Sequence, residues 1–204
     1  MLKPDIVVFT GNLVTNEFKI TIDDTAFLVN ELSRIETTIG KYYIYGDLDY
    51  SYNEYENVMN DSNFKLLNNS YEEIIYHTEE PIYIVGFPSS IKENINVDDS
   101  FKFYNDSDRH FIIVLVSNGR TIKYLDESTY EVDLILGGYS LNGSVRLPLI
   151  GGLFKDNYSY KYFDSEYNKG ITNIYISGGL GTRKWGYRLF NHPSFNLYRL
   201  KSQS

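Results

Sequence analysis

The chain has 204 residues, of which 42% are hydrophobic and 23% are charged, so it is long enough to bury a substantial core and has the composition of a globular protein. The formal net charge of −8 argues against a broad electrostatic partner such as nucleic acid or an anionic lipid surface. The absence of cysteine excludes a disulfide, a zinc site built on thiolates and a cysteine nucleophile.

The first part of the chain has the pattern of a strand, a helix and a second strand. The apolar run "DIVVFTG" at 5–11 predicts a strand buried on both faces and closed by glycine. Apolar residues at helical spacing over 23–40 predict a helix, with Asp23 or Asp24 as its cap and Gly40 at its end. The run "KYYIYGD" at 41–47 predicts the second strand, so these elements favour a βαβ unit with parallel strands.

The rest of the chain is richer in predicted strands than in helices. Short apolar runs predict strands at 72–77, 81–87, 110–117, 132–138, 172–181 and 195–200. A short helix is expected at 53–62 and about one helical turn at 120–130. Because no helical period separates the last two runs, we expect an antiparallel or mixed sheet there, and two sheets in one layered domain spanning 1–204.

No targeting or membrane-spanning segment is recognisable in the sequence. The N-terminus runs directly into the first strand pattern and lacks the apolar stretch of a signal peptide. No apolar run approaches the roughly 20 residues that a membrane-spanning helix needs. We therefore expect a cytoplasmic protein that is not inserted in a membrane.

Four predicted strands end in short segments that contain glycine. These segments are "TGN" at 10–12, "YGDLDY" at 45–50, "VSNG" at 116–119 and "LGGYSLNG" at 136–143. Ligands of open α/β sheets bind at the carboxyl ends of the strands. We therefore expect the four segments to converge on one site.

Four ordered stretches carry a resemblance to the calcineurin-like metallophosphoesterases, especially their bacterial phosphodiesterase-like branch. They are "LKPDIVVFTGNLV" at 2–14, "YIYGDLDY" at 43–50, "VDLILGGYSLNGSVRLPLIGGL" at 132–153 and "IYISGGLGTRKWGYRLFNHPSFNLYRL" at 174–200. The resemblance covers nearly the whole chain and implies a four-layered α/β sandwich with two mixed sheets. It also implies a pair of metal ions that clamp a phosphoryl group and generate the attacking hydroxide.

The positions that match the family's metal ligands have mostly lost their ligand side chains. Asn12 stands where the family has its bridging aspartate, and Leu48 stands where it has its catalytic histidine. Ser117 aligns with a ligand histidine, and Tyr139 and Leu141 replace two further histidines. The resemblance therefore implies a degenerate metal site.

Two carboxylates remain at matched positions. Asp47 stands at the position of a ligand asparagine, and Asp49 keeps the family's aspartate, whose usual partner is the lost histidine. The pair can bind one cation weakly, or it can simply stabilise the turn at the end of the strand. The family's first strand, with its Asp-x-His motif, has no counterpart in the chain, so we expect an N-terminally truncated fold.

These departures favour a catalytically inactive homologue, a pseudoenzyme that acts as a binding or scaffolding module with no cofactor. The alternative is a weak or altered metal-dependent phosphoesterase with one Mn²⁺ or Mg²⁺ at Asn12, Asp47 and Asp49. The histidines of the chain, His77, His110 and His192, match no ligand of the family.

Two surfaces are candidates for partner binding. Strand edges left by the missing N-terminal strand favour pairing with a protein partner or with a second copy. Arg183, Trp185 and Tyr187 form a basic and aromatic cluster of the kind found in binding hot spots, although aromatic core packing explains them equally well. The surrounding glycine-rich loop lacks a phosphate-binding motif.

Overall fold

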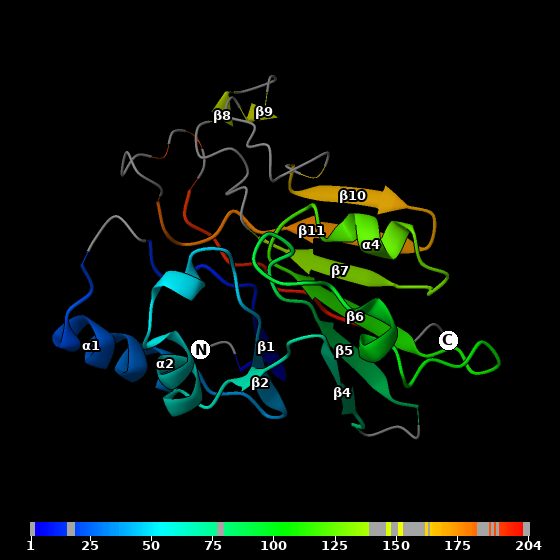
Figure 1. The fold of residues 1–204 in the computed structure, drawn as a ribbon, viewed down its shortest axis with the longest axis horizontal. Coiled ribbons are helices and arrows are strands. Elements are labelled where there is room, and N and C mark those ends of the chain that lie inside the picture. Colours follow the sequence, from blue (N-terminus) through cyan, green and yellow to red (C-terminus); the bar gives the residue numbers. More distant parts are fainter. Residues whose placement is uncertain are drawn as a thin grey trace.

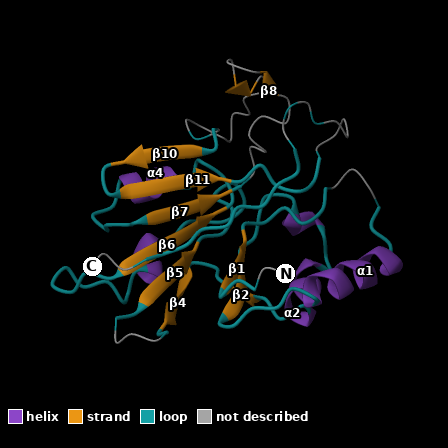
Figure 2. Ribbon diagram, turned by 180° about the vertical axis from the view of Figure 1, so that it is seen from behind, coloured by secondary structure: helices purple, strands orange, loops and turns teal. Residues whose placement is uncertain are grey.

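The computed structural model describes residues 3–15, 19–76, 80–138, 146–147, 151–152, 162, 164–182, 188, 190 and 192–201. These residues form an α/β sandwich in which two sheets pack against each other and helices cover their outer faces (Figure 1). Figure 2 shows α1 and α2 on the side of the small sheet that faces away from the large one. The expected layered fold is confirmed.

The small sheet is the predicted βαβ unit with one added strand. Its order is β1-β2-β3, and both pairings are parallel, so among the described residues the expectation of a mixed sheet is wrong for the small sheet. The elements are β1 (Ile6–Phe9), α1 (Ile22–Ser33), β2 (Gly40–Tyr43), α2 (Tyr55–Asp61) and β3 (Lys65–Leu66). The predicted strands and helices at these places are confirmed, and β3 is an element that the sequence pattern did not predict.

The ends of α1 differ from the prediction. Thr21, not Asp23 or Asp24, is the N-cap residue, and it forms a capping box with Asp24. The helix ends at Ser33, and Gly40 begins β2 instead of ending the helix. Thr21 takes this role because its backbone is extended, which lets its hydroxyl accept the Asp24 amide hydrogen.

The large sheet has six strands in the order β10-β11-β7-β6-β5-β4. The central four are parallel to one another, and the two edge strands are antiparallel to their neighbours. The strands are β4 (Ser70–Ile74), β5 (Ile82–Gly86), β6 (Phe111–Val116), β7 (Leu134–Gly137), β10 (Glu166–Lys169) and β11 (Thr172–Ile176). The remaining elements are α3 (Val97–Ser100), α4 (Ile122–Asp126) and the short pair β8 (Arg146–Leu147) and β9 (Gly151–Gly152).

Of the two strands predicted near the end of the chain, one is present in the structure and the other is not. The predicted strand at 172–181 is β11, which joins the large mixed sheet. The predicted strand at 195–200 is wrong, because these residues form no ladder with any described strand. Tyr198 packs its ring 4.9 Å from that of Tyr175, while Phe195 and Leu197 are exposed.

The two sheets lie face to face, and contacts at each side show which strands of one sheet lie next to which strands of the other. Lys65 of β3 is 2.5 Å from Glu72 of β4, so β3 lies by the β4 side of the large sheet. At the other side, a Cβ atom added to Gly138 after β7 would lie 2.8 Å from the hydroxyl of Thr10 after β1. Apolar side chains of both sheets fill the space between them in one buried cluster. The open edge of β1 therefore faces the side of β11 and β10.

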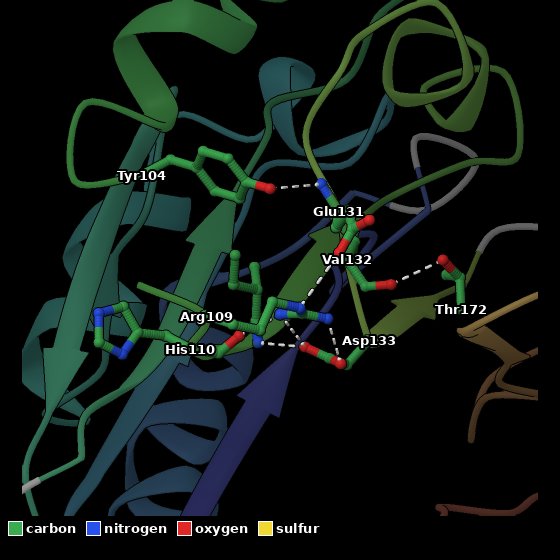
Figure 3. Close-up of polar contacts among 8 residues, drawn as sticks. Tyr104, Arg109, His110, Glu131, Val132, Asp133 and Thr172 are labelled. Carbon is green, nitrogen blue, oxygen red and sulfur yellow. Dashed lines mark hydrogen bonds and ion pairs between the residues drawn. The ribbon is translucent and has the colours of Figure 1, made fainter. Parts of the chain in front are cut away.

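A polar clamp joins the amino ends of the central strands, at the edge opposite the predicted site (Figure 3). The Arg109 guanidinium donates to both carboxylate oxygens of Asp133 at 3.1 and 2.6 Å. Asp133 also accepts the Ile112 amide hydrogen at 2.8 Å, so the carboxylate ties the start of β6 to the start of β7. The Glu131 carboxylate is a second, more exposed partner of Arg109 at 3.3 Å.

The clamp predicts unequal effects of two substitutions. Asp133→Ala should lower the free energy of unfolding by about 2 kcal/mol, because it removes a bidentate ion pair and leaves the Ile112 amide unpaired. Glu131→Ala should cost no more than about 0.5 kcal/mol, because it removes only an exposed pair. Urea unfolding of the two variants checks this, and equal losses would contradict the role given to Asp133.

Candidate functional site

The carboxyl ends of strands from both sheets meet at one place. A Cβ atom added to Gly46 after β2 would lie 2.4 Å from the side-chain oxygen of Asn12 after β1. One added to Gly138 after β7 would lie 3.9 Å from the carbonyl oxygen of Ser117 after β6. The predicted convergence is confirmed for the described part of these segments, and residues 139–145 lie outside it.

Asp49 is the centre of the hydrogen bonds at this place. It begins a short 3₁₀ helix, Asp49–Ser51, and its side chain is buried. One carboxylate oxygen accepts the amide hydrogens of Asn12 at 2.6 Å and Gly46 at 2.7 Å, and the other accepts that of Leu13 at 2.8 Å. Asp49 therefore fastens the loop after β1 to the loop after β2.

Burial sets the protonation of Asp49. Removal from water raises the pKa of this carboxyl from 3.8 to about 6, although the amide hydrogens of Gly46, Asn12 and Leu13 act in the opposite direction. The carboxyl therefore titrates at mildly acidic pH while it holds the two loops together.

Asn12 and Leu48 belong to the same set of contacts. Asn12 has a positive φ of 62°, a conformation that asparagine tolerates better than most residues. Its side-chain oxygen accepts the amide hydrogen of Leu48 at 3.0 Å. The amide oxygen that would have to bind a metal is thus used in a loop contact, and the half-buried Leu48 side chain offers no ligand atom.

Asp47 faces a second group of buried polar side chains. One of its oxygens accepts a hydrogen bond from the Ser89 hydroxyl and lies 3.4 Å from the donating amide nitrogen of Asn118. Ser89, Ser117 and Asn118 are fully buried at the ends of β5 and β6. Ser89 was missed by sequence reasoning, and the only available signal was its place just after an apolar strand.

The described residues do not fit a two-metal centre. Both oxygens of Asp49 and the side-chain oxygen of Asn12 accept backbone amide hydrogens, so they are not directed at a shared cation. Within the described ranges, no three histidine, cysteine, aspartate or glutamate side chains are grouped so that they could hold a metal ion. A two-metal site needs a dense set of such ligands.

The other sequence candidates fall into two groups. Tyr139, Leu141, Arg183, Trp185, Tyr187 and His77 lie outside the described residues. His110 lies away from the site, with its ring nitrogen 3.3 Å from the Asp108 carboxylate, and His192 is exposed.

The chain is similar to a known protein over almost its whole length. It is 28% identical over 203 residues to the uncharacterized metallophosphoesterase YkuE of Bacillus subtilis (strain 168), and the match covers 98% of this chain and 69% of that protein. No protein-family model matches the chain. In the described part of the chain, no helix has the length and apolar character needed to cross a membrane. The similarity agrees with the two-sheet α/β fold and with the four stretches of resemblance, and it supports a metallophosphoesterase-like chain.

Proposed function

We propose that the chain is a catalytically inactive metallophosphoesterase homologue that acts as a binding or scaffolding module. The observation that carries the proposal is the role of Asp49. This carboxylate accepts the amide hydrogens of Asn12, Leu13 and Gly46, so its oxygens are directed at the backbone and not at a cation shared with Asn12 and Asp47. The neutral side chains of Asn12, Leu48 and Ser117 at matched positions support the same conclusion.

A turnover assay tests this proposal. Purified protein with Mn²⁺ and bis-p-nitrophenyl phosphate should release no more nitrophenol than Mn²⁺ in buffer, because no pair of metals is available to activate water. The Asp47→Ala variant, prepared in the same way, should give the same background. Turnover by the natural chain that disappears in Asp47→Ala would overturn the proposal, whereas equal turnover in both preparations would indicate a contaminating enzyme.

A second candidate is a weak or altered phosphoesterase with a single metal site. It is favoured by the oxygen-rich surroundings of Asp47, where Ser89, Ser117 and Asn118 are all buried, because such ligands suit Mg²⁺ and Mn²⁺. Calorimetry with millimolar Mn²⁺ and Mg²⁺ tests it. Heat of binding that is lost in Asp47→Asn would support the candidate, and the absence of any binding would remove it.

The proposed binding role requires a protein partner or a second copy of the chain. The cytoplasmic location expected from the sequence stays a prediction, and fractionation of the source cells tests it.

A further inference from the structure

The Asp47 carboxylate is buried at the end of the sandwich where strands of both sheets finish. A buried charge is strongly unfavourable unless a cation or hydrogen-bond donors compensate it. The Ser89 hydroxyl and the Asn118 side-chain amide both donate to the same oxygen of Asp47, the second of them across 3.4 Å. Hydrogen bonds therefore join the loop after β2 to the loops after β5 and β6.

The orientation of the Asn118 side chain is fixed by its other neighbours. Its Oδ1 atom accepts the backbone amide hydrogen of Arg120 at 3.0 Å, and its Nδ2 atom donates to the Ser117 hydroxyl at 3.2 Å. Turning the amide by 180° would set its NH₂ group against the Arg120 amide hydrogen, and two donors cannot pair. The donor side of Asn118 therefore faces Asp47, and a donor repels a cation.

The Ser89 hydroxyl is oriented in a similar way. Its Oγ atom accepts the Ile91 amide hydrogen at 3.2 Å, while its own hydrogen is donated to Asp47. Ser89 and Asn118 are both fully buried, so bulk water does not compete for these bonds. A cation bound to this oxygen of Asp47 would have to displace both donated hydrogens.

The other described side chains at matched positions are engaged by the protein as well. The Asn12 side-chain oxygen accepts the Leu48 amide hydrogen at 3.0 Å, and the Ser117 hydroxyl oxygen accepts from Asn118. Both oxygens of Asp49 accept backbone amide hydrogens. Where the resemblance implies metal ligands, the structure thus has acceptors that are paired with donors of the chain.

We propose that the hydrogen bonds from Ser89 and Asn118 to Asp47 replace a metal ion as the cross-link between the loops after β2, β5 and β6. This end of the sandwich then keeps its arrangement without a bound cation. The inference rests on the proposed inactivity and goes beyond it, because inactivity alone does not tell what holds the loops together. It gives Ser89 and Asn118 a role that the resemblance does not supply.

Thermal unfolding of the natural chain with and without metal tests the proposal and needs no variant. The melting temperature should differ by less than about 1 °C between about 5 mM EDTA and about 5 mM Mn²⁺ or Mg²⁺ at matched ionic strength. A cation bound with a dissociation constant of about 0.1 mM would raise it by roughly 5 °C or more, because a ligand of the folded state stabilises by mass action. A rise of that size in the natural chain would overturn the proposal.

Two neighbouring serines give a matched pair of variants. Ser89→Ala should lower the melting temperature by about 5 °C, because Asp47 loses a buried donor and the Ile91 amide loses its acceptor. Ser90→Ala should lower it by less than about 2 °C, because that half-buried hydroxyl makes only a 3.5 Å contact with the Asn118 Oδ1 atom. Equal shifts in the two variants would contradict the role given to Ser89.

Asn118→Asp tests whether the Asn118 donor lies where a cation would bind. The variant sets a second carboxylate beside Asp47, close to the Ser89 and Ser117 hydroxyls, and Mn²⁺ prefers such oxygen ligands. At pH 8, about 5 mM Mn²⁺ should raise the melting temperature of Asn118→Asp by roughly 5 °C or more but leave Asn118→Ala unchanged. A folded Asn118→Asp variant that Mn²⁺ does not stabilise would overturn the proposal.

The cross-link and the proposed function fail on different results. A natural chain that Mn²⁺ stabilises but that shows no turnover would lose the cross-link and stay an inactive homologue. Turnover abolished by Asp47→Ala, in a chain whose melting temperature does not respond to Mn²⁺, would do the reverse.

Discussion

The Asp49→Ala substitution is expected to lower the free energy of unfolding by about 3 kcal/mol at pH 5, because buried amides that lose their acceptor cost about 1–3 kcal/mol each. The affected amides are those of Asn12, Leu13 and Gly46, in the loops after β1 and β2, and of the bonds joining these loops only the one between the Leu48 amide and the Asn12 side chain would remain beside those of the strand ladder. Urea unfolding followed by circular dichroism measures the loss. Asp23→Ala, which removes an exposed carboxylate of α1, should change stability by less than about 0.5 kcal/mol.

The same residue predicts a dependence of stability on pH. The pKa of Asp49 is raised from 3.8 to about 6 by burial, so the folded state holds this proton more tightly than the unfolded state does. The resulting stability is present in full below about pH 4 and is lost as the pH rises through about 6. Between pH 5 and pH 7 the loss is about 1–2 kcal/mol.

Comparison with Asp49→Asn isolates this contribution. The variant cannot titrate, so the difference in unfolding free energy between the natural chain and Asp49→Asn should shrink as the pH rises from 5 to 7. A difference that grows with pH would mean that the amide hydrogens outweigh burial and that the pKa of Asp49 lies below its ordinary value.

The apolar pattern of the sequence predicts the interior strands well and the edge elements poorly. β6 and β7 are continuous apolar runs, and the structure places them at the centre of the large sheet. β3 and β10 are short or polar, so no period marks them. The segment 195–200 has the apolar pattern of a strand but forms none, because a strand also needs a neighbour, which no local pattern reveals.

For the site, the sequence predicts the place but not the contacts. Ligand sites of open α/β sheets lie at the carboxyl ends of the strands, and this places Asn12, Asp47, Asp49 and Ser117 at one edge of the sandwich, as observed in the structure. It does not predict that the Asp49 carboxylate accepts backbone amide hydrogens, nor that the Ser89 hydroxyl donates to Asp47, which is 42 positions away in the sequence. These contacts depend on how two loops pack, which is a tertiary property.

The Gly11→Ala substitution should have the larger effect of two glycine changes and should prevent stable folding. Gly11 has a φ of +87°, and an added Cβ atom would lie 2.3 Å from the amide nitrogen and 2.6 Å from the Cα atom of Gly46. Neither contact can be relieved by turning a side chain, because both are with backbone. The loops after β1 and β2 would have to separate, which would also break the Gly46 bond to Asp49. We expect a loss of more than about 4 kcal/mol, measured by urea unfolding or seen as insoluble protein.

Gly170→Ala separates the two causes of this loss. Gly170 lies in the turn between β10 and β11 with a φ of +65°, but nothing lies within 4 Å of an added Cβ atom. It should therefore cost only the backbone strain of about 1–2 kcal/mol. If both variants lost the same free energy of unfolding, backbone strain alone would explain the effect of Gly11→Ala, and the close packing of the two loops would contribute nothing. If Gly11→Ala alone fails to fold, the contact between the β1 and β2 loops is what requires glycine there. The resemblance at 2–14 and 43–50 would then be explained at Gly11 and Gly46 by the packing of the two loops, independently of any catalytic activity at the site.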